Sequence, residues 1–177
     1  ARELAAGNPA SFLHVCRPEI DLPEGVSLYS EPVYAKGREN LDRFESDGTL
    51  VPDPVPRLLV YRQTWRGAAQ DGLVAGCAVD DYDSDVIKKH EKTRKDKEDD
   101  RTKHLLAQAA HAEPVFLTYR ATDAIDARIA NVTAAPPGID FEAVDGVRHS
   151  LWVVPEEDEA FFVGAFASIP VLYVADG

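Results

Sequence analysis

A run of charged side chains between residues 86 and 111 holds residue types that could bind phosphate and move a proton. From Lys88 to Lys103 the sequence has eight Lys and Arg residues and five Asp and Glu residues, whereas the whole chain has 19 basic and 31 acidic residues. A basic segment on an acidic chain concentrates positive potential and attracts small polyanions such as nucleotide phosphates. The alternative interpretation is a solvated helix face, which is what most dense charge runs are.

The order of residues in this run predicts a turn between a strand and a helix. A buried strand is expected to pass through residues 80–85 and into residues 86–94. Thr93 followed by Asp96 matches a capping box, which predicts a helix from about Arg94 to His111. Because free N–H groups and the helix dipole favour anions at such a turn, we assign phosphate or substrate contacts to the cationic and hydroxyl side chains around it. These are Lys88, Lys89, Thr93, Arg94, Lys97 and Arg101.

Glu91 is the strongest candidate for a general base, with His90 beside it as a second catalytic candidate. The surrounding Lys and Arg side chains would hold the Glu91 carboxylate ionised, in the turn where an anion would dock. Phosphoryl transfer also needs acids for Mg²⁺, which the aspartates of residues 80–85 could supply. The alternative for Glu91 is an exposed ion pair of little energetic value. His90-Glu91 is not a zinc-protease motif, because position 94 is Arg rather than His, and no metal site is predicted.

Composition predicts one soluble globular domain spanning residues 1–177, with 45% hydrophobic and 28% charged residues. No apolar run is long enough for a membrane span and no signal peptide is visible. Cys16 and Cys77 lie in apolar strand-like runs and are expected to be reduced core residues of a cytoplasmic protein. The net charge of −12 argues against a nucleic-acid partner.

The sequence is also expected to be a fragment of a longer protein. It contains no Met, even at position 1, and it ends directly after a predicted strand.

Periodicity and turn residues predict a mixed α+β fold, with a mixed sheet and flanking helices. Asp145-Gly146 is the strongest hairpin signal, and Thr122 is expected to cap a short helix. The strands are expected at residues 11–16, 58–65, 72–79, 115–119, 139–144, 147–154 and 171–174, and the remaining helices at about residues 32–48 and around Phe161–Phe166.

Seven segments together resemble the bacterial and archaeal family called domain of unknown function 1015, in the family's order and over essentially the whole chain. They are SFLHV (11–15), RPEIDLP (17–23), YRQT (61–64), VIKKHEKT (86–93), KEDDR (97–101), FLTY (116–119) and ADG (175–177). The family's final Asp-Gly is expected to continue into His-His-Arg, and an Ala-Pro-Pro-Tyr-Asp segment is expected before the first strand. Neither is present here, which implies a middle fragment truncated at both ends.

The family is similar, through its Asp-Gly-His-His-Arg turn, to the ParB and sulfiredoxin superfamily, whose members include free-serine kinases. This resemblance implies ParB/sulfiredoxin-like elements in the fold, and it implies that Asp176 and Gly177 begin a phosphate-binding turn. It also implies ATP or ADP with Mg²⁺ as cofactor, and phosphoryl transfer to a small hydroxyl compound such as a free amino acid.

Two other functions remain open at this point. A non-catalytic module that senses a nucleotide or binds a partner would bind nucleotide without turnover. A DNA-binding role like that of partition proteins is disfavoured by the acidic surroundings. The expected partners are therefore a nucleotide and a hydroxyl substrate, without nucleic acid or membrane.

Overall fold

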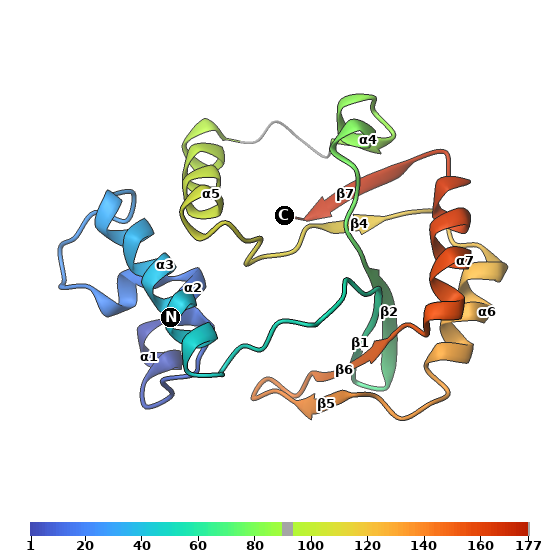
Figure 1. Ribbon diagram of the computed structural model, residues 1–177, viewed down its shortest axis with the longest axis horizontal. Coiled ribbons are helices and arrows are strands. Elements are labelled where there is room, and N and C mark those ends of the chain that lie inside the picture. Colours follow the sequence, from blue (N-terminus) through green and yellow to red (C-terminus); the bar gives the residue numbers. More distant parts are fainter. Residues whose placement is uncertain (90–93, 177) are drawn as a thin grey trace. The chain divides into compact units, whose positions relative to one another are not determined.

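The chain folds into two compact units in a computed structural model that describes residues 1–89 and 94–176 (Figure 1). Unit 1 contains the described parts of Ala1–Pro52, Glu91–Phe116 and Asp176–Gly177, and unit 2 contains those of Asp53–His90 and Leu117–Ala175. Helices and strands occur together, which confirms the predicted α+β class. Among the described residues, no helix has both the length and the apolar character needed to cross a membrane.

Unit 1 is built from helices. They are α1 (Arg2–Ala5), α2 (Leu13–Cys16), the 3₁₀ helix η1 (Pro18–Asp21), α3 (Glu31–Ser46) and α5 (Lys95–Gln108). The predicted helix at residues 32–48 is confirmed as α3, where Val33, Tyr34, Leu41 and Phe44 recur at helical spacing and are buried. Leu41 and Phe44 pack with Val15 of α2 in a small core, which attaches α2 to α3.

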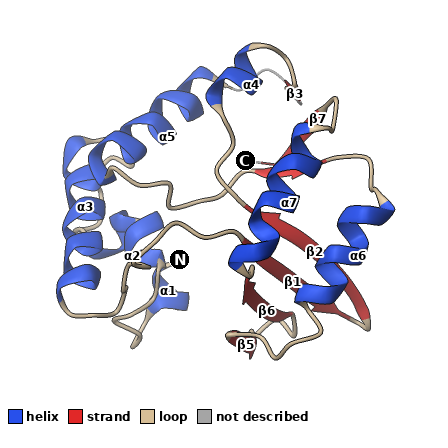
Figure 2. Ribbon diagram, turned by 45° about the vertical axis from the view of Figure 1, so that its right-hand side comes forward, coloured by secondary structure: helices blue, strands red, loops and turns tan. Residues whose placement is uncertain are grey.

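Unit 2 contains a four-stranded sheet with the order β2-β1-β6-β5. Its elements are β1 (Leu59–Trp65), β2 (Ala68–Val74), β5 (Ile139–Glu142) and β6 (Arg148–Val153), together with α6 (Asp123–Val132) and α7 (Glu156–Ala167). Both helices lie against one face of this sheet (Figure 2). The hydrophobic core between the sheet and these two helices consists of Val60, Ile125, Ile129, Val132, Trp152, Val154, Phe162 and Ile169.

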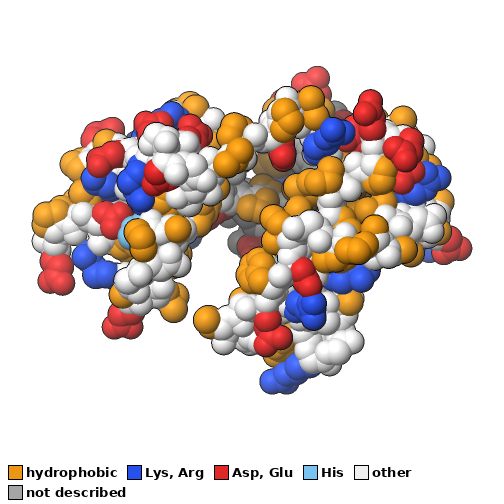
Figure 3. Space-filling model, turned by 60° about the horizontal axis from the view of Figure 1, so that its bottom comes forward, with side chains coloured by type: hydrophobic (Ala, Val, Ile, Leu, Met, Phe, Trp, Pro, Cys, Tyr) orange, Lys and Arg blue, Asp and Glu red, His pale blue; other side chains and the backbone are white. Residues whose placement is uncertain are grey.

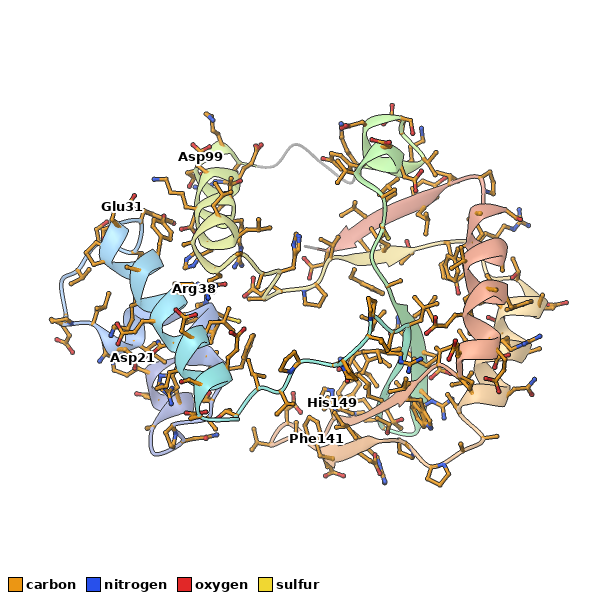
Figure 4. The ribbon with its side chains drawn as sticks, viewed as in Figure 1. Asp21, Glu31, Arg38, Asp99, Phe141 and His149 are labelled. Carbon is orange, nitrogen blue, oxygen red and sulfur yellow. The ribbon has the colours of Figure 1, made fainter. Side chains whose placement is uncertain are left out.

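The opposite face of this sheet carries a row of rings. Phe141 and His149 lie next to each other on β5 and β6 (Figure 4), with ring centroids 5.1 Å apart. The Tyr61 hydroxyl on β1 lies 2.6 Å from His149 Nδ1. The alternation of strand side chains separates this row from the helix-covered core.

A second sheet has three strands in the order β3-β7-β4, with β3 parallel to β7. Its strands are β3 (Ile87–Lys88), β7 (Leu172–Asp176) and β4 (Phe116–Thr118), and the short helix α4 (Val79–Asp83) precedes β3. These positions confirm the strands predicted at residues 115–119 and 171–174. The hairpin at Asp145-Gly146 and the Thr122 cap, whose Oγ1 accepts a hydrogen bond from Ile125 N, are also confirmed.

Several local predictions were wrong. Residues 11–16 do not form a strand, since Leu13–Cys16 are helix α2. A short apolar run fits a buried strand or a buried helical turn equally well, and packing against α3 selects the helix. Residues 80–83 belong to α4, and the following strand is only Ile87–Lys88.

The first hairpin of unit 2 is antiparallel as predicted, but its second strand is earlier than predicted, at Ala68–Val74. The connecting turn is only Arg66-Gly67, and both residues have positive φ angles of 50° and 81°. A two-residue turn with this geometry matches the twist of the paired strands. As a result Cys77 lies after the strand and is exposed, so the prediction that it is a core residue was wrong.

Candidate functional site

Unit 1 contains an open cavity of about 570 Å³. This size lies within the range of roughly 300–1,000 Å³ that is typical of small-molecule sites. The second half of α5 forms one wall, and the other contributions come from α2, the segment after α5 and the end of β7. The lining residues are Cys16, Arg101, His104, Leu105, Gln108, Ala110, His111, Ala112, Glu113, Pro114, Val115, Phe116 and Asp176.

Two of the sequence-predicted phosphate contacts, Arg101 and Asp176, line this cavity together. They are separated by 75 positions in the sequence, so their meeting is a property of the fold. Arg101 forms an ion pair with Glu113, and the two side chains are 56% and 43% exposed. An exposed pair of this kind contributes little to stability. A phosphate group that enters the cavity could therefore replace the Glu113 carboxylate as the partner of the Arg101 guanidinium at little cost in stability.

The end of α5 is anchored by a buried amide. The Gln108 side chain is 2% exposed, and its Nε2 donates a hydrogen bond of 2.9 Å to the Val15 carbonyl of α2. Arg38 of α3, labelled in Figure 4, donates from Nη1 to the Gln108 carbonyl at 2.7 Å. The next residue, Ala109, has a φ of 52°, and this left-handed conformation ends the helix. These contacts fix the wall of the cavity on α2 and α3.

A cluster of three titratable side chains lies between α3 and the cavity. The Tyr34 hydroxyl donates to Asp100 Oδ1 at 3.0 Å, and the same Oδ1 lies 3.8 Å from His104 Nε2. The Tyr34 and His104 rings meet edge to face, with centroids 4.8 Å apart. Burial, followed by the hydrogen bond to Asp100, raises the pKa of Tyr34 to about 12. Burial lowers the pKa of His104, against the opposing charge of Asp100.

Cys16 is not suited to act as a nucleophile in this cavity. Burial, with a smaller contribution from the charge of Glu113, raises its pKa to about 11. Its thiol therefore stays protonated at neutral pH, and the thiolate is the reactive form. The Sγ atom lies 3.9 Å from the Ala112 carbonyl, which places the thiol against the cavity wall.

Other predicted phosphate contacts do not line the cavity. Arg94 forms an ion pair with Asp96 at 2.7 Å, and Lys97 donates to the Tyr29 hydroxyl at 2.9 Å. The helix begins at Lys95 with Arg94 as its N-cap, and no side chain forms the cap hydrogen bond. Asp96, the second residue of the predicted capping box, binds Arg94, whereas the first, Thr93, lies outside the described residues, so the box itself stays a prediction.

Lys88 and Lys89 belong to unit 2. Lys88 is an exposed residue of β3, and Lys89 Nζ lies 4.6 Å from the centre of the Tyr82 ring. The remaining predicted residues, His90, Glu91, Thr93 and Gly177, lie outside the described residues, and their roles stay predictions.

No group of three or more His, Cys, Asp and Glu side chains within residues 1–89 and 94–176 could hold a metal ion. The aspartates of residues 80–85 therefore form no such group of three, and their proposed part in holding Mg²⁺ stays a prediction. On the face shown in Figure 3, Lys and Arg side chains lie among Asp and Glu side chains.

A second hollow, of about 400 Å³, lies near the start of unit 1 and includes His14 and Asp21 in its lining. His14 Nδ1 lies 2.9 Å from Asp21, and Nε2 lies 3.2 Å from the Asn8 carbonyl. Asn40 donates to Asp21 at 2.8 Å and to the His14 carbonyl at 2.7 Å. Since these polar groups satisfy one another, we interpret the hollow as structural.

The model of one protein family, described as "Protein of unknown function (DUF1015)", matches residues 1–177. The chain belongs to this family. No curated protein and no solved structure matches the chain. The resemblance seen in the seven sequence segments is thus confirmed at the level of the DUF1015 family.

Sequence reasoning did not identify several of the side chains that shape this DUF1015 cavity. Asp100 and His104 are four residues apart on a predicted helix, and that spacing was a usable signal. Tyr34, Gln108 and Glu113 gave no such signal, because each is connected to the site only through tertiary packing.

Proposed function

We propose that this chain binds a nucleotide, ATP or ADP, in the unit 1 cavity, and that it transfers the terminal phosphoryl group to a small hydroxyl compound such as a free amino acid. The observation that carries the proposal is that Arg101 of the charged helix and Asp176 of the C-terminal segment line one cavity. For the charged run, the connection with phosphate binding comes from its residue types and the predicted turn. The resemblance of the Asp176-Gly177 segment to the phosphate turn of ParB/sulfiredoxin-like kinases supports the same assignment.

The composition of the cavity fits a phosphate ester attached to an apolar group. Arg101 presents a guanidinium, which recognises phosphate oxygens through paired N–H donors. Leu105, Val115 and Phe116 form apolar surface in the same cavity. Sites for small organic ligands typically combine such surface with a few polar groups.

The described residues contain no group of three or more His, Cys, Asp and Glu side chains that could enclose a metal ion by themselves. Mg²⁺ usually arrives bound to the phosphates and keeps several of its waters. No step of the proposal is derived through the metal. The reaction is proposed for the cytoplasm, without nucleic acid or membrane.

A second candidate function is a nucleotide-sensing module without catalysis. The ion pair between Arg101 and Glu113 favours it, because an arriving phosphate would replace the Glu113 carboxylate and release the segment that carries it. This candidate predicts nucleotide binding without a phosphorylated product, and it predicts that Glu91→Gln changes no activity.

Binding of ATP and ADP by the full chain, followed by calorimetry, tests the shared part of both functions. We expect Arg101→Gln to weaken binding by roughly 10- to 100-fold, because a hydrogen bond to a charged group contributes about 1.5–3 kcal/mol. Lys95→Gln is the matched control, since it also removes one charge from α5 and one ion pair, with Asp99. Lys95 does not line the cavity.

Incubation with labelled ATP or ADP, Mg²⁺ and a panel of amino acids and sugars tests transfer. A labelled acceptor supports the phosphotransferase. Binding without any labelled acceptor supports the sensing module. A chain that binds neither nucleotide, or equal losses in Arg101→Gln and Lys95→Gln, would remove the basis of both functions.

A further inference from the structure

His104 is the one imidazole in the described part of the cavity that stands beside a carboxylate on its own helix. His104 and Asp100 are 15% and 18% exposed, so the pair is largely withdrawn from water while His104 still lines the cavity. His111 lines the same cavity but is exposed. The two histidines therefore differ in their surroundings within one site.

The two ring nitrogens of His104 have different environments. Nε2 faces Asp100 Oδ1 at 3.8 Å, whereas Nδ1 makes no hydrogen bond to any residue that the structure describes. A carboxylate on one side of an imidazole stabilises the ring when it becomes protonated and leaves the other nitrogen to accept the proton.

Asp100 is itself fixed by Tyr34. The tyrosine ring is 3% exposed, and its hydroxyl donates to the same oxygen that faces His104. The edge-to-face contact between the Tyr34 and His104 rings restricts the imidazole from α3. The arrangement of base, carboxylate and orienting hydroxyl is complete within unit 1.

We propose that His104 is the base that removes the proton from the acceptor hydroxyl, and that Asp100, held by Tyr34, positions and stabilises its ring. The inference depends on the proposed phosphoryl transfer. The O–H bond of the acceptor breaks and its proton goes to His104 Nδ1. The acceptor oxygen bonds to the terminal phosphorus of the nucleoside triphosphate or diphosphate, and the bridging P–O bond breaks. The electron pair of this P–O bond stays on the bridging oxygen, which leaves as part of the nucleoside diphosphate or monophosphate.

Burial of the ring, opposed by most of the charges around it, leaves His104 able to accept a proton at neutral pH. Asp100 on α5, Glu19 on η1 and Glu113 after α5 raise the pKa of His104, and Arg101 lowers it, but burial is the largest cause and the net shift is downward. The ordinary histidine pKa is about 6.5. His104 is therefore neutral at pH 7 and able to accept a proton, and activity is expected to fall only as the pH drops below that ordinary value.

The test compares three variants of the full chain for nucleotide affinity and for transfer to the best acceptor. His104→Asn removes the proposed base, His111→Asn removes a second imidazole from the same cavity, and Glu91→Gln removes the base predicted from the sequence. General base catalysis contributes typically about 10²- to 10⁴-fold to a rate. We expect His104→Asn to lower kcat by about that factor while the Kd for nucleotide stays near that of the wild type. His111→Asn, which removes a cavity imidazole that has no carboxylate partner on its own helix, should lower kcat much less than His104→Asn.

Two further measurements separate a chemical role from a structural one. Added imidazole should restore transfer to His104→Ala, which leaves space beside Asp100. Asp100→Asn removes the charge that raises the His104 pKa, so the acidic limb of its pH profile should move to lower pH.

The outcomes separate the two proposals. Full transfer by His104→Asn, or a large loss in Glu91→Gln alone, overturns the assignment of His104 and leaves the phosphotransferase standing. A wild-type chain that binds nucleotide and phosphorylates no acceptor overturns both. A loss of nucleotide binding in His104→Asn, without rescue of His104→Ala by imidazole, shows a structural histidine and also overturns the assignment.

Discussion

Replacing Gly37 with Ala tests the packing that holds the cavity wall in place. Gly37 lies in the middle of α3, and a Cβ built on it would lie 2.8 Å from Gln108 Nε2, 3.3 Å from Pro18 Cγ and 3.5 Å from the Val15 carbonyl oxygen. The Gln108 side chain cannot move away at low cost, because it is buried and bound to Val15. Pro18 is also fully buried.

The expected change in stability is the difference between a local gain and a packing loss. Alanine favours a helix over glycine by about 1 kcal/mol. Overpacking costs about 1–3 kcal/mol, and a buried amide that loses its partner costs about 1–3 kcal/mol more. Because Gln108 must shift to admit the methyl group, both costs apply, and the unfolding free energy should fall by roughly 1–5 kcal/mol.

Gly164→Ala is the matched control. Gly164 lies in α7, and a Cβ built there meets nothing within 4 Å. The same substitution should therefore stabilise unit 2 by up to about 1 kcal/mol through helix propensity alone. Urea unfolding followed by far-UV circular dichroism measures both variants. Trp65 and Trp152 lie in unit 2, so tryptophan fluorescence reports that unit separately.

A stabilised Gly37→Ala variant, or equal effects at Gly37 and Gly164, would refute the reasoning. The double variant Gly37→Ala/Gln108→Ala provides a further check. If the clash with Gln108 causes the loss, the double variant should be less destabilised than the sum of the two single variants. An additive result would place the cause at Pro18 or Val15 instead.

Three more predictions follow from single contacts. The hydrogen bonds from Arg148, followed by that from Ser150, lower the pKa of Asp140 to about 2. The ionised carboxylate therefore stabilises unit 2 when the pH is above the ordinary carboxyl pKa of about 4, and this stabilisation is lost as the pH falls towards 2. Asp140→Asn should remove that pH dependence from acid unfolding. A thiol reagent at neutral pH should label the exposed Cys77 rapidly and Cys16 slowly, and Cys77→Ser should remove the rapid phase. Thr122→Ala should lower the unfolding free energy of unit 2 by about 0.5–2 kcal/mol through loss of the α6 cap, with urea unfolding as the measurement.

The parts of the fold that sequence reasoning predicted correctly are those with a local cause. Asp145-Gly146 specifies its hairpin through turn geometry, and Gly146 adopts the expected positive φ of 79°. The helix α3 combines Pro32 in its first turn with apolar residues at helical spacing. In each case the residues that decide the structure lie within one turn or one helix.

The incorrect predictions concern segments whose structure is decided by distant partners. Val15 is completely buried, but the sequence does not reveal that Leu41 and Phe44 of a helix would cover it. The candidate site follows the same rule. Arg101 and Asp176 were identified from their types and neighbours, whereas Tyr34 contributes only because α3 packs on α5.

The charged helix also differs from its sequence pattern in a way that bears on ligand binding. The sequence predicts a basic segment that concentrates positive potential, but in the described part of this segment most cations contact a specific partner. Arg94 and Lys95 pair with Asp96 and Asp99, while Lys97 and Lys103 lie over the rings of Tyr29 and Tyr34. The two ion pairs offset part of the field that the run projects into solvent, whereas Lys97 and Lys103 keep their charge. Arg101 is also paired, with Glu113, but among the predicted cations that the structure describes it alone lines the cavity. We therefore expect affinity for an anion to depend more on the geometry around Arg101 than on the net charge of the segment. A single substitution in the cavity should then outweigh the loss of an equal charge elsewhere on α5.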